Sequence, residues 1–84
     1  MVKRIKSIEW KEVEGETILL NHKKNEFFVL NETGTIVWKK LNGKNSEEMI
    51  SKELAKKFKV TEKKALADTK QLIKKLVSIN LARN

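Results

Sequence analysis

The chain contains no cysteine, no proline and no tyrosine, and only three of its residues are glycine. Without cysteine it can form neither disulfide bonds nor zinc sites built on thiolates. No segment approaches the run of about 18 apolar residues that would span a membrane. The basic start, Met1 to Lys6, is not followed by the apolar core of a signal peptide. We therefore expect a cytoplasmic protein that has no contact with a membrane.

Catalysis is the next function that the sequence argues against. A chain of 84 residues predicts a single domain over residues 1–84, and a fold of this size has no room for a deep active-site cavity beside its core. Hydrophobic residues make up 39% and charged residues 36%, which favours a folded chain with a highly charged surface. We expect no enzymatic activity, no cofactor and no metal site.

The charge balance of +8, from 19 basic and 11 acidic residues, has two interpretations. Clustered cations would indicate a surface for nucleic acid, whereas dispersed ones indicate a solvated surface with ion pairs. All the basic residues are lysines except Arg4 and Arg83, and the lysines are spread along the chain among glutamates. Since base recognition favours arginine, the solvated surface is the better prediction.

The front third of the chain has the residue pattern of strands. Ser7–Val13, Thr17–Leu20 and Phe27–Leu30 are rich in β-branched, aliphatic or aromatic residues, and Glu14-Gly15-Glu16 separates the first two. The polar segment 21–26 predicts a turn between the last two strands. We expect three antiparallel strands, with Ile18 and Leu20 facing the core.

Three helices are predicted after residue 30. Asn31 is a good N-cap for the first helix, which ends before Gly43, and Asn45-Ser46 begins the second. Thr61 caps a third helix of about five turns, with Leu81 as the last candidate residue of its apolar face. The predicted core joins strands and helices through Ile18, Leu20, Val37, Trp38, Leu41, Ile50, Leu54, Phe58, Leu72 and Leu76.

The third helix has a wider apolar face than one packing contact requires. Two neighbouring lines run along it, Ala65-Thr69-Leu72-Leu76 and Leu66-Ile73-Val77. Either both lines are buried, or one of them lines a groove between this helix and the last strand.

The stretch from Phe27 to Trp38, FFVLNETGTIVW, resembles the signature of the PqqD-like family, in which an aromatic strand leads into Leu-Asn-Glu-x-Gly and an apolar-Trp pair. Leu19-Leu20-Asn21, Asn42-Gly43, the second helix and the segment Asp68–Leu76 are similar to other parts of that family. The resemblance implies an α+β, winged-helix-like domain of three antiparallel strands followed by three helices.

The resemblance also implies a function. Such domains are non-catalytic recognition elements that bind the leader of a ribosomal precursor peptide as an added strand, in the cleft between the third strand and the third helix. Lys70, Lys74 and Lys75 would then attract carboxylates of the leader. Carried over by position, the peptide-binding residues are Glu26, Phe27, Phe28, Val29, Leu30, Leu66, Lys70, Ile73, Lys74 and Val77.

The resemblance leaves several pathways open. The expected partners are a precursor peptide and a separate modifying enzyme or leader peptidase, in lasso-peptide or related biosynthesis. The alternative is a peptide chaperone in pyrroloquinoline quinone (PQQ) synthesis that works with a radical S-adenosylmethionine enzyme, but the proline-rich beginning of that subgroup has no counterpart here.

A DNA-binding winged helix is the alternative from a different class of protein. The third helix begins Glu62-Lys63-Lys64, without the Arg, Asn or Gln side chains that read bases, so no nucleic-acid partner is expected. The single histidine, His22, belongs to the polar turn and is expected to be a solvated loop residue.

Overall fold

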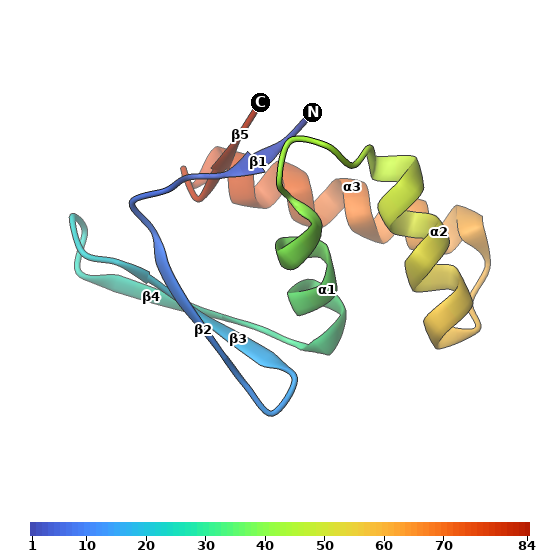
Figure 1. Cartoon of the computed structure of the whole chain (residues 1–84), viewed down its shortest axis with the longest axis horizontal. Coiled ribbons are helices and arrows are strands. Elements are labelled where there is room, and N and C mark those ends of the chain that lie inside the picture. The colour runs from blue at the N-terminus through green and yellow to red at the C-terminus, as the bar shows by residue number, and fades with distance from the viewer.

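The computed structural model describes all residues, 1–84, and has an α+β architecture (Figure 1). A three-stranded antiparallel sheet, in the order β2-β3-β4, is followed by three helices, which confirms the predicted order. A second sheet pairs β1 with β5 and was not predicted. The elements are β1 (Lys3–Arg4), β2 (Glu9–Val13), β3 (Glu16–Asn21), β4 (Glu26–Leu30), α1 (Glu32–Lys40), α2 (Glu47–Phe58), α3 (Glu62–Ser78) and β5 (Ala82–Arg83).

Each helix begins at the cap that the sequence predicts. The side chains of Asn31, Ser46 and Thr61 accept a hydrogen bond from the amide three residues further on, at 2.8, 3.1 and 3.1 Å. Such a bond satisfies one of the amides that have no partner at a helix start. None of the three helices is both long and apolar enough to cross a membrane.

The main core lies between β3 and the helices. Thr17 and Leu19 of β3 and Trp38 of α1 are fully buried, and Val37 of α1 is only 1% exposed. Thr17 Oγ1 donates a hydrogen bond of 2.8 Å to Thr35 Oγ1, so the two buried hydroxyls satisfy each other. This bond fixes β3 against α1 at one register.

The prediction that Ile18 and Leu20 face the core is wrong. Side chains alternate along a strand, and here Leu19 points inward while Leu20 is 36% exposed on the opposite face. Because three consecutive residues, Ile18-Leu19-Leu20, are all apolar, hydrophobicity alone does not reveal which face is buried.

Two other core assignments are only partly correct, since Phe58 and Leu72 pack against the core but are not fully buried. The remaining predicted core residues are confirmed as buried: Val37, Trp38, Leu41, Ile50, Leu54 and Leu76.

The third helix has about the predicted length but does not include Leu81. It ends at Ser78, and Asn80 follows with a positive φ of 62°, which turns the chain out of the helix. Leu81 therefore lies beyond α3, where it is fully buried and its amide donates to the carbonyl of Leu76 at 2.9 Å. This turn brings β5 beside β1 (Figure 1).

Arg4 links the amino-terminal segment to the end of α1. Its guanidinium donates to the carbonyls of Trp38 and Lys39, both at 2.9 Å, and lies 5.5 Å from the centre of the Trp10 ring. The two tryptophan rings meet edge to face, with 6.3 Å between their centres. A cation near a helix carboxyl terminus and over an aromatic ring is stabilised by both contacts.

Replacing Trp38 with alanine tests this packing. Because the ring is fully buried, Trp38→Ala should lower the free energy of unfolding by about 3–5 kcal/mol, measured by denaturant titration. Trp10→Ala is the matched control and should cost less, since Trp10 is 40% exposed. Equal losses for both variants would contradict the central position assigned to Trp38.

Candidate functional site

The β4 edge of the main sheet is unpaired. β4 forms its ladder with β3 on one side only, and no other strand lies along its second side. The backbone groups that point to this side follow from the register of the two hairpins.

The β2–β3 turn sets the alternation of hydrogen bonds. Glu14 and Gly15 form a two-residue loop with φ values of 51° and 84°, the signs of a type I′ turn. In such a turn the flanking residues, Val13 and Glu16, are a hydrogen-bonded pair. Hydrogen-bonded pairs alternate with non-bonded pairs in an antiparallel ladder, so every second residue of β3, starting at Glu16, bonds to β2.

The other residues of β3, Thr17, Leu19 and Asn21, bond to β4. Their partners are Leu30, Phe28 and Glu26. The N–H and C=O groups of the two intervening residues, Phe27 and Val29, therefore point away from β3 and along the free edge. These two residues offer two donors and two acceptors to an extended chain.

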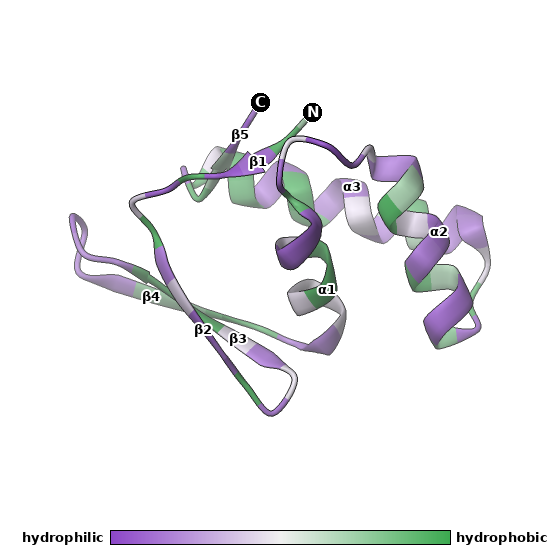
Figure 2. Ribbon diagram, viewed as in Figure 1, coloured by the Kyte–Doolittle hydropathy of each residue, from purple (hydrophilic) through white to green (hydrophobic).

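The two edges of the sheet differ in chemistry. β2 carries charged side chains at Glu9, Lys11 and Glu12, which oppose pairing with a further strand. β4 has the sequence EFFVL, with one charge at its start. Figure 2 shows apolar residues along β4 and a hydrophilic hairpin tip beside it. Since only β4 lacks protection by charge, it is the edge suited to binding a strand.

A groove of about 750 Å³ runs beside this edge. It is bounded by the end of β4, the start of α1 and one side of α3. Leu30 and Leu72 contribute apolar surface, while Lys74 and Lys75 contribute positive charge. The lining residues are Val29, Leu30, Asn31, Thr33, Gly34, Asp68, Gln71, Leu72, Lys74, Lys75 and Ser78.

The side of the sheet that faces away from the helices is also apolar at this edge. Phe27 is 68% exposed and Val29 is 55% exposed, and their neighbour across the strands, Leu20, belongs to the same face. A strand added to β4 would place alternate side chains on this face and the others in the groove.

The structure brings only part of the predicted helix set to the groove. Lys74 lines it, whereas Lys70 and Val77 line a second hollow on the other side of α3. Ile73 belongs to the buried core, at 4% exposure, and Leu66 is half-buried. Of the two alternatives for its line, burial therefore holds for Ile73, and truncation of this residue is expected to reduce stability.

Sequence reasoning missed three residues of α3 that line the groove, Asp68, Gln71 and Leu72, and named Lys75 only as a charge that attracts the leader. The groove residues follow helical spacing along one side of the buried line, whereas Lys70 and Val77 lie on its other side. The sequence contains a signal that could have identified them. The buried residues of α3 form one line, and the remaining residues then divide into two sides, one of which faces the groove. The buried line is Ala65, Thr69, Ile73 and Leu76.

No part of the structure gathers three or more metal-type ligands, and His22 forms an exposed contact of 3.3 Å with Glu9 at the sheet edge. The surface beside β4 presents outward backbone groups, apolar side chains and lysines, a combination suited to an extended chain.

Fold and site together define a class: a small α+β domain whose sheet leaves one unprotected edge beside its last helix. The chain belongs to the PqqD family, because the family model described as "Coenzyme PQQ synthesis protein D (PqqD)" matches residues 16–82. The family resemblance stated from the sequence is thereby confirmed. No curated protein matches the chain.

Two solved structures share the fold over almost the whole chain. One is TbiB1 in complex with the TbiA(beta) leader peptide, which is 18% identical with a TM-score of 0.87 and covers 98% of this chain and 95% of its own. The other is a lasso peptide synthetase B1 complexed with the leader peptide; it is 19% identical with a TM-score of 0.87, and the match covers 99% of this chain and 98% of that one.

Amide exchange tests the assignment of the free edge. In the free protein the amides of Phe27 and Val29 should exchange at least about ten times faster than those of Phe28 and Leu30, which are bonded to β3. Hydrogen exchange followed by NMR at single residues measures this. An exchange rate for Phe28 as fast as that of its two neighbours would show that the register is wrong.

Proposed function

We propose that this chain is a non-catalytic protein that binds the leader of a ribosomal precursor peptide by strand addition and presents it to a separate enzyme. The observation that carries this proposal is the free edge of β4, where the outward N–H and C=O groups of Phe27 and Val29 adjoin the groove beside α3. An extended peptide is the ligand that satisfies such groups.

The bound peptide would gain affinity from the main chain and specificity from side chains. Pairing with Phe27 and Val29 forms up to four backbone hydrogen bonds. Every second side chain of the peptide then enters the groove against Leu30 and Leu72, and the others extend the apolar face at Leu20. We propose Glu26 to Leu30, Leu72, Lys74 and Lys75 as the peptide-binding residues, in place of the set that includes Ile73.

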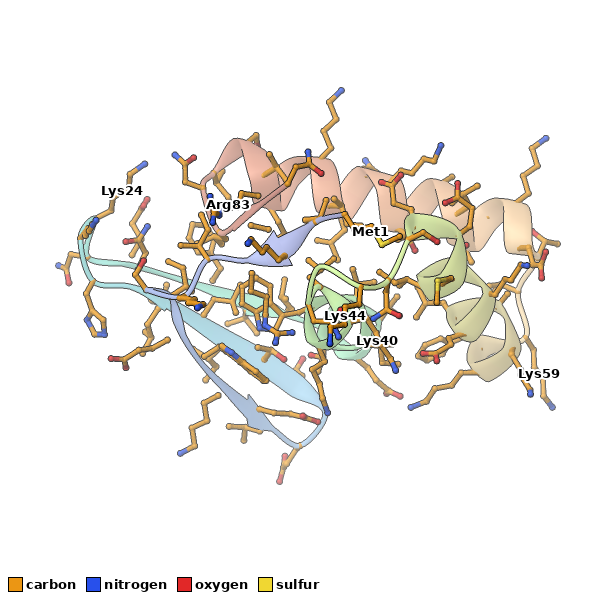
Figure 3. The ribbon with its side chains drawn as sticks, turned by 45° about the horizontal axis from the view of Figure 1, so that its top comes forward. Met1, Lys24, Lys40, Lys44, Lys59 and Arg83 are labelled. Carbon is orange, nitrogen blue, oxygen red and sulfur yellow. The ribbon has the colours of Figure 1, made fainter.

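Charge favours an acidic leader. Lys74 and Lys75 line the groove, and no salt bridge engages either of them. Lys24 lies at the tip of the β3–β4 hairpin, at one end of the β4 edge, far from Lys59 at the opposite end of the molecule (Figure 3). Positive charge along the groove increases the rate at which an acidic peptide is captured.

The pathway is proposed from the relatives. Both solved relatives are complexes with leader peptides, and one is a lasso peptide synthetase B1. We therefore place the chain in lasso-peptide or related biosynthesis, in the cytoplasm, beside a separate modifying enzyme or leader peptidase. The family description favours PQQ synthesis as the second candidate. A gene for a precursor peptide and a leader peptidase next to this gene would support the first, and a gene for a radical S-adenosylmethionine enzyme the second.

Removing one outward amide tests strand addition. Val29→Pro deletes the N–H that faces the peptide, and proline is tolerated at the free side of an edge strand. The affinity for the leader of a precursor peptide encoded beside the gene should fall by about 100-fold or more, as measured by fluorescence anisotropy. The control, Val29→Ala, keeps the amide and should lose far less.

Both variants are first checked for an unchanged melting temperature, so that a loss of fold is not mistaken for a loss of binding. Equal affinity of Val29→Pro and the parent protein would contradict the proposal, because an added strand would lose a hydrogen bond and leave one of its carbonyls unpaired.

Reversing two groove charges tests the electrostatic part. Lys74→Glu with Lys75→Glu should lower the association rate for an acidic leader by about 10-fold or more at low salt, with little change at high salt. Stopped-flow mixing measures the rate. Lys52→Glu with Lys56→Glu, an equal charge change on exposed positions of α2, should leave the rate closer to that of the parent. Equal effects of the two pairs would mean that only the net charge matters.

A further inference from the structure

We propose that, in the absence of a peptide, two copies of this chain associate through their β4 strands, each strand occupying the free edge of the other. The sequence of β4 is complementary to itself about Phe28. In an antiparallel pair centred on this residue, Phe27 lies opposite Val29 of the second copy, and Val29 lies opposite its Phe27. These are the residues whose backbone groups point outward, so the register forms four hydrogen bonds and leaves none of those groups unpaired.

The side chains match in the same register. Phe27 and Val29 belong to the exposed face of the sheet, so the pair creates two aromatic–β-branched contacts across the strands on that face. Phe28, which is half-buried on the groove side, meets Phe28 of the second copy. Two residues that are more than half exposed in the single chain thereby gain apolar neighbours.

The charges at the two ends of β4 are also complementary. Antiparallel pairing sets the start of one strand beside the end of the other, so Lys23 and Lys24 at the hairpin tip approach Glu32 at the start of α1 of the second copy. The net charge of +8 on each copy opposes association over longer distances. The pair is therefore weak in dilute salt and becomes stronger as salt screens the repulsion.

This inference rests on the free edge itself and not on the leader-peptide proposal. Where a leader does bind β4, it competes with the second copy for the same backbone groups. Self-association then shields the edge, which is otherwise open to non-specific pairing, until a peptide displaces the second copy.

Sedimentation velocity on the full chain tests the inference. Concentrations from about 10 µM to about 1 mM cover the range of weak association, and each series is measured in about 50 mM and about 500 mM sodium chloride. We expect the average mass to rise from that of one chain towards that of two, and to rise further in the higher salt. Val29→Pro and Phe27→Lys should raise the dissociation constant by at least about 10-fold.

Two controls separate this interface from others. Met49→Lys makes a similar change at an exposed apolar residue of α2 and should associate as the parent does. Leu20→Lys alters the exposed face on the central strand, away from the edge, and should retain association. A chain that stays monomeric at every concentration would overturn the inference. Association that Leu20→Lys removes but Val29→Pro preserves would also overturn it, since the faces and not the edges would then be in contact.

A titration with the leader peptide separates the two proposals. Loss of association on peptide addition supports competition for β4. A peptide that binds while the pair persists would overturn the shared edge. Edge-dependent association in a chain that binds no leader would leave this inference standing and contradict the proposed function instead.

Discussion

The buried hydrogen bond between Thr17 and Thr35 is the constraint on which the sheet depends. It joins β3 to α1 at 2.8 Å, where both hydroxyls are sealed from water. A slip of one residue along β3 would turn Thr17 outward and leave Thr35 without a hydrogen-bond partner. It would also replace Leu19 in the core with Ile18 and Leu20. This bond determines which face of β3 is buried. Because β2 and β4 pair with β3 in a fixed register, it also determines which of their side chains lie on the exposed face. The exposed face formed by Leu20, Phe27 and Val29 is therefore a consequence of how β3 meets the first helix.

The same register explains why the two edges of the sheet differ. With β3 fixed, Phe27 and Val29 must direct their backbone groups to the open side of the sheet. Charges at Glu9, Lys11 and Glu12 protect the β2 edge, and the ion pair of Glu12 with Lys39 at 2.9 Å ties that strand to α1. The β4 edge has no such charges, and α3 stands far enough away to leave a groove. The open edge thus arises because neither charged side chains nor a neighbouring element cover it, with no special side chain required.

Much of the fold could be predicted from the sequence. Asn31, Ser46 and Thr61 indicate the helix starts, because their side chains can accept hydrogen bonds from the unpaired amides of the first turn. The polar segment before β4 indicates the hairpin turn. The phase of β3 could not be predicted, because Ile18, Leu19 and Leu20 are equally apolar and the decisive residue is a polar one, Thr17. The sheet of β1 and β5 was not predicted, because strands of two residues are too short to show an alternation of apolar and polar side chains. The strand half of the proposed site follows from the family resemblance. Of the predicted helix residues only Lys74 lines the groove beside β4, since two adjacent apolar lines concealed the core line.

The most direct test of the central claim is an isotope-filtered NMR experiment on the labelled protein with unlabelled leader peptide. An antiparallel strand paired with the outward groups of Phe27 and Val29 makes Phe28 a non-hydrogen-bonded partner of the peptide, with about 4.5 Å between the two Cα atoms. The account predicts a strong contact between Hα of Phe28 and an Hα of the peptide, with further peptide contacts to Leu72. Contacts that instead join the peptide to Trp10 and Glu12 on the β2 edge, or to α2, would contradict it.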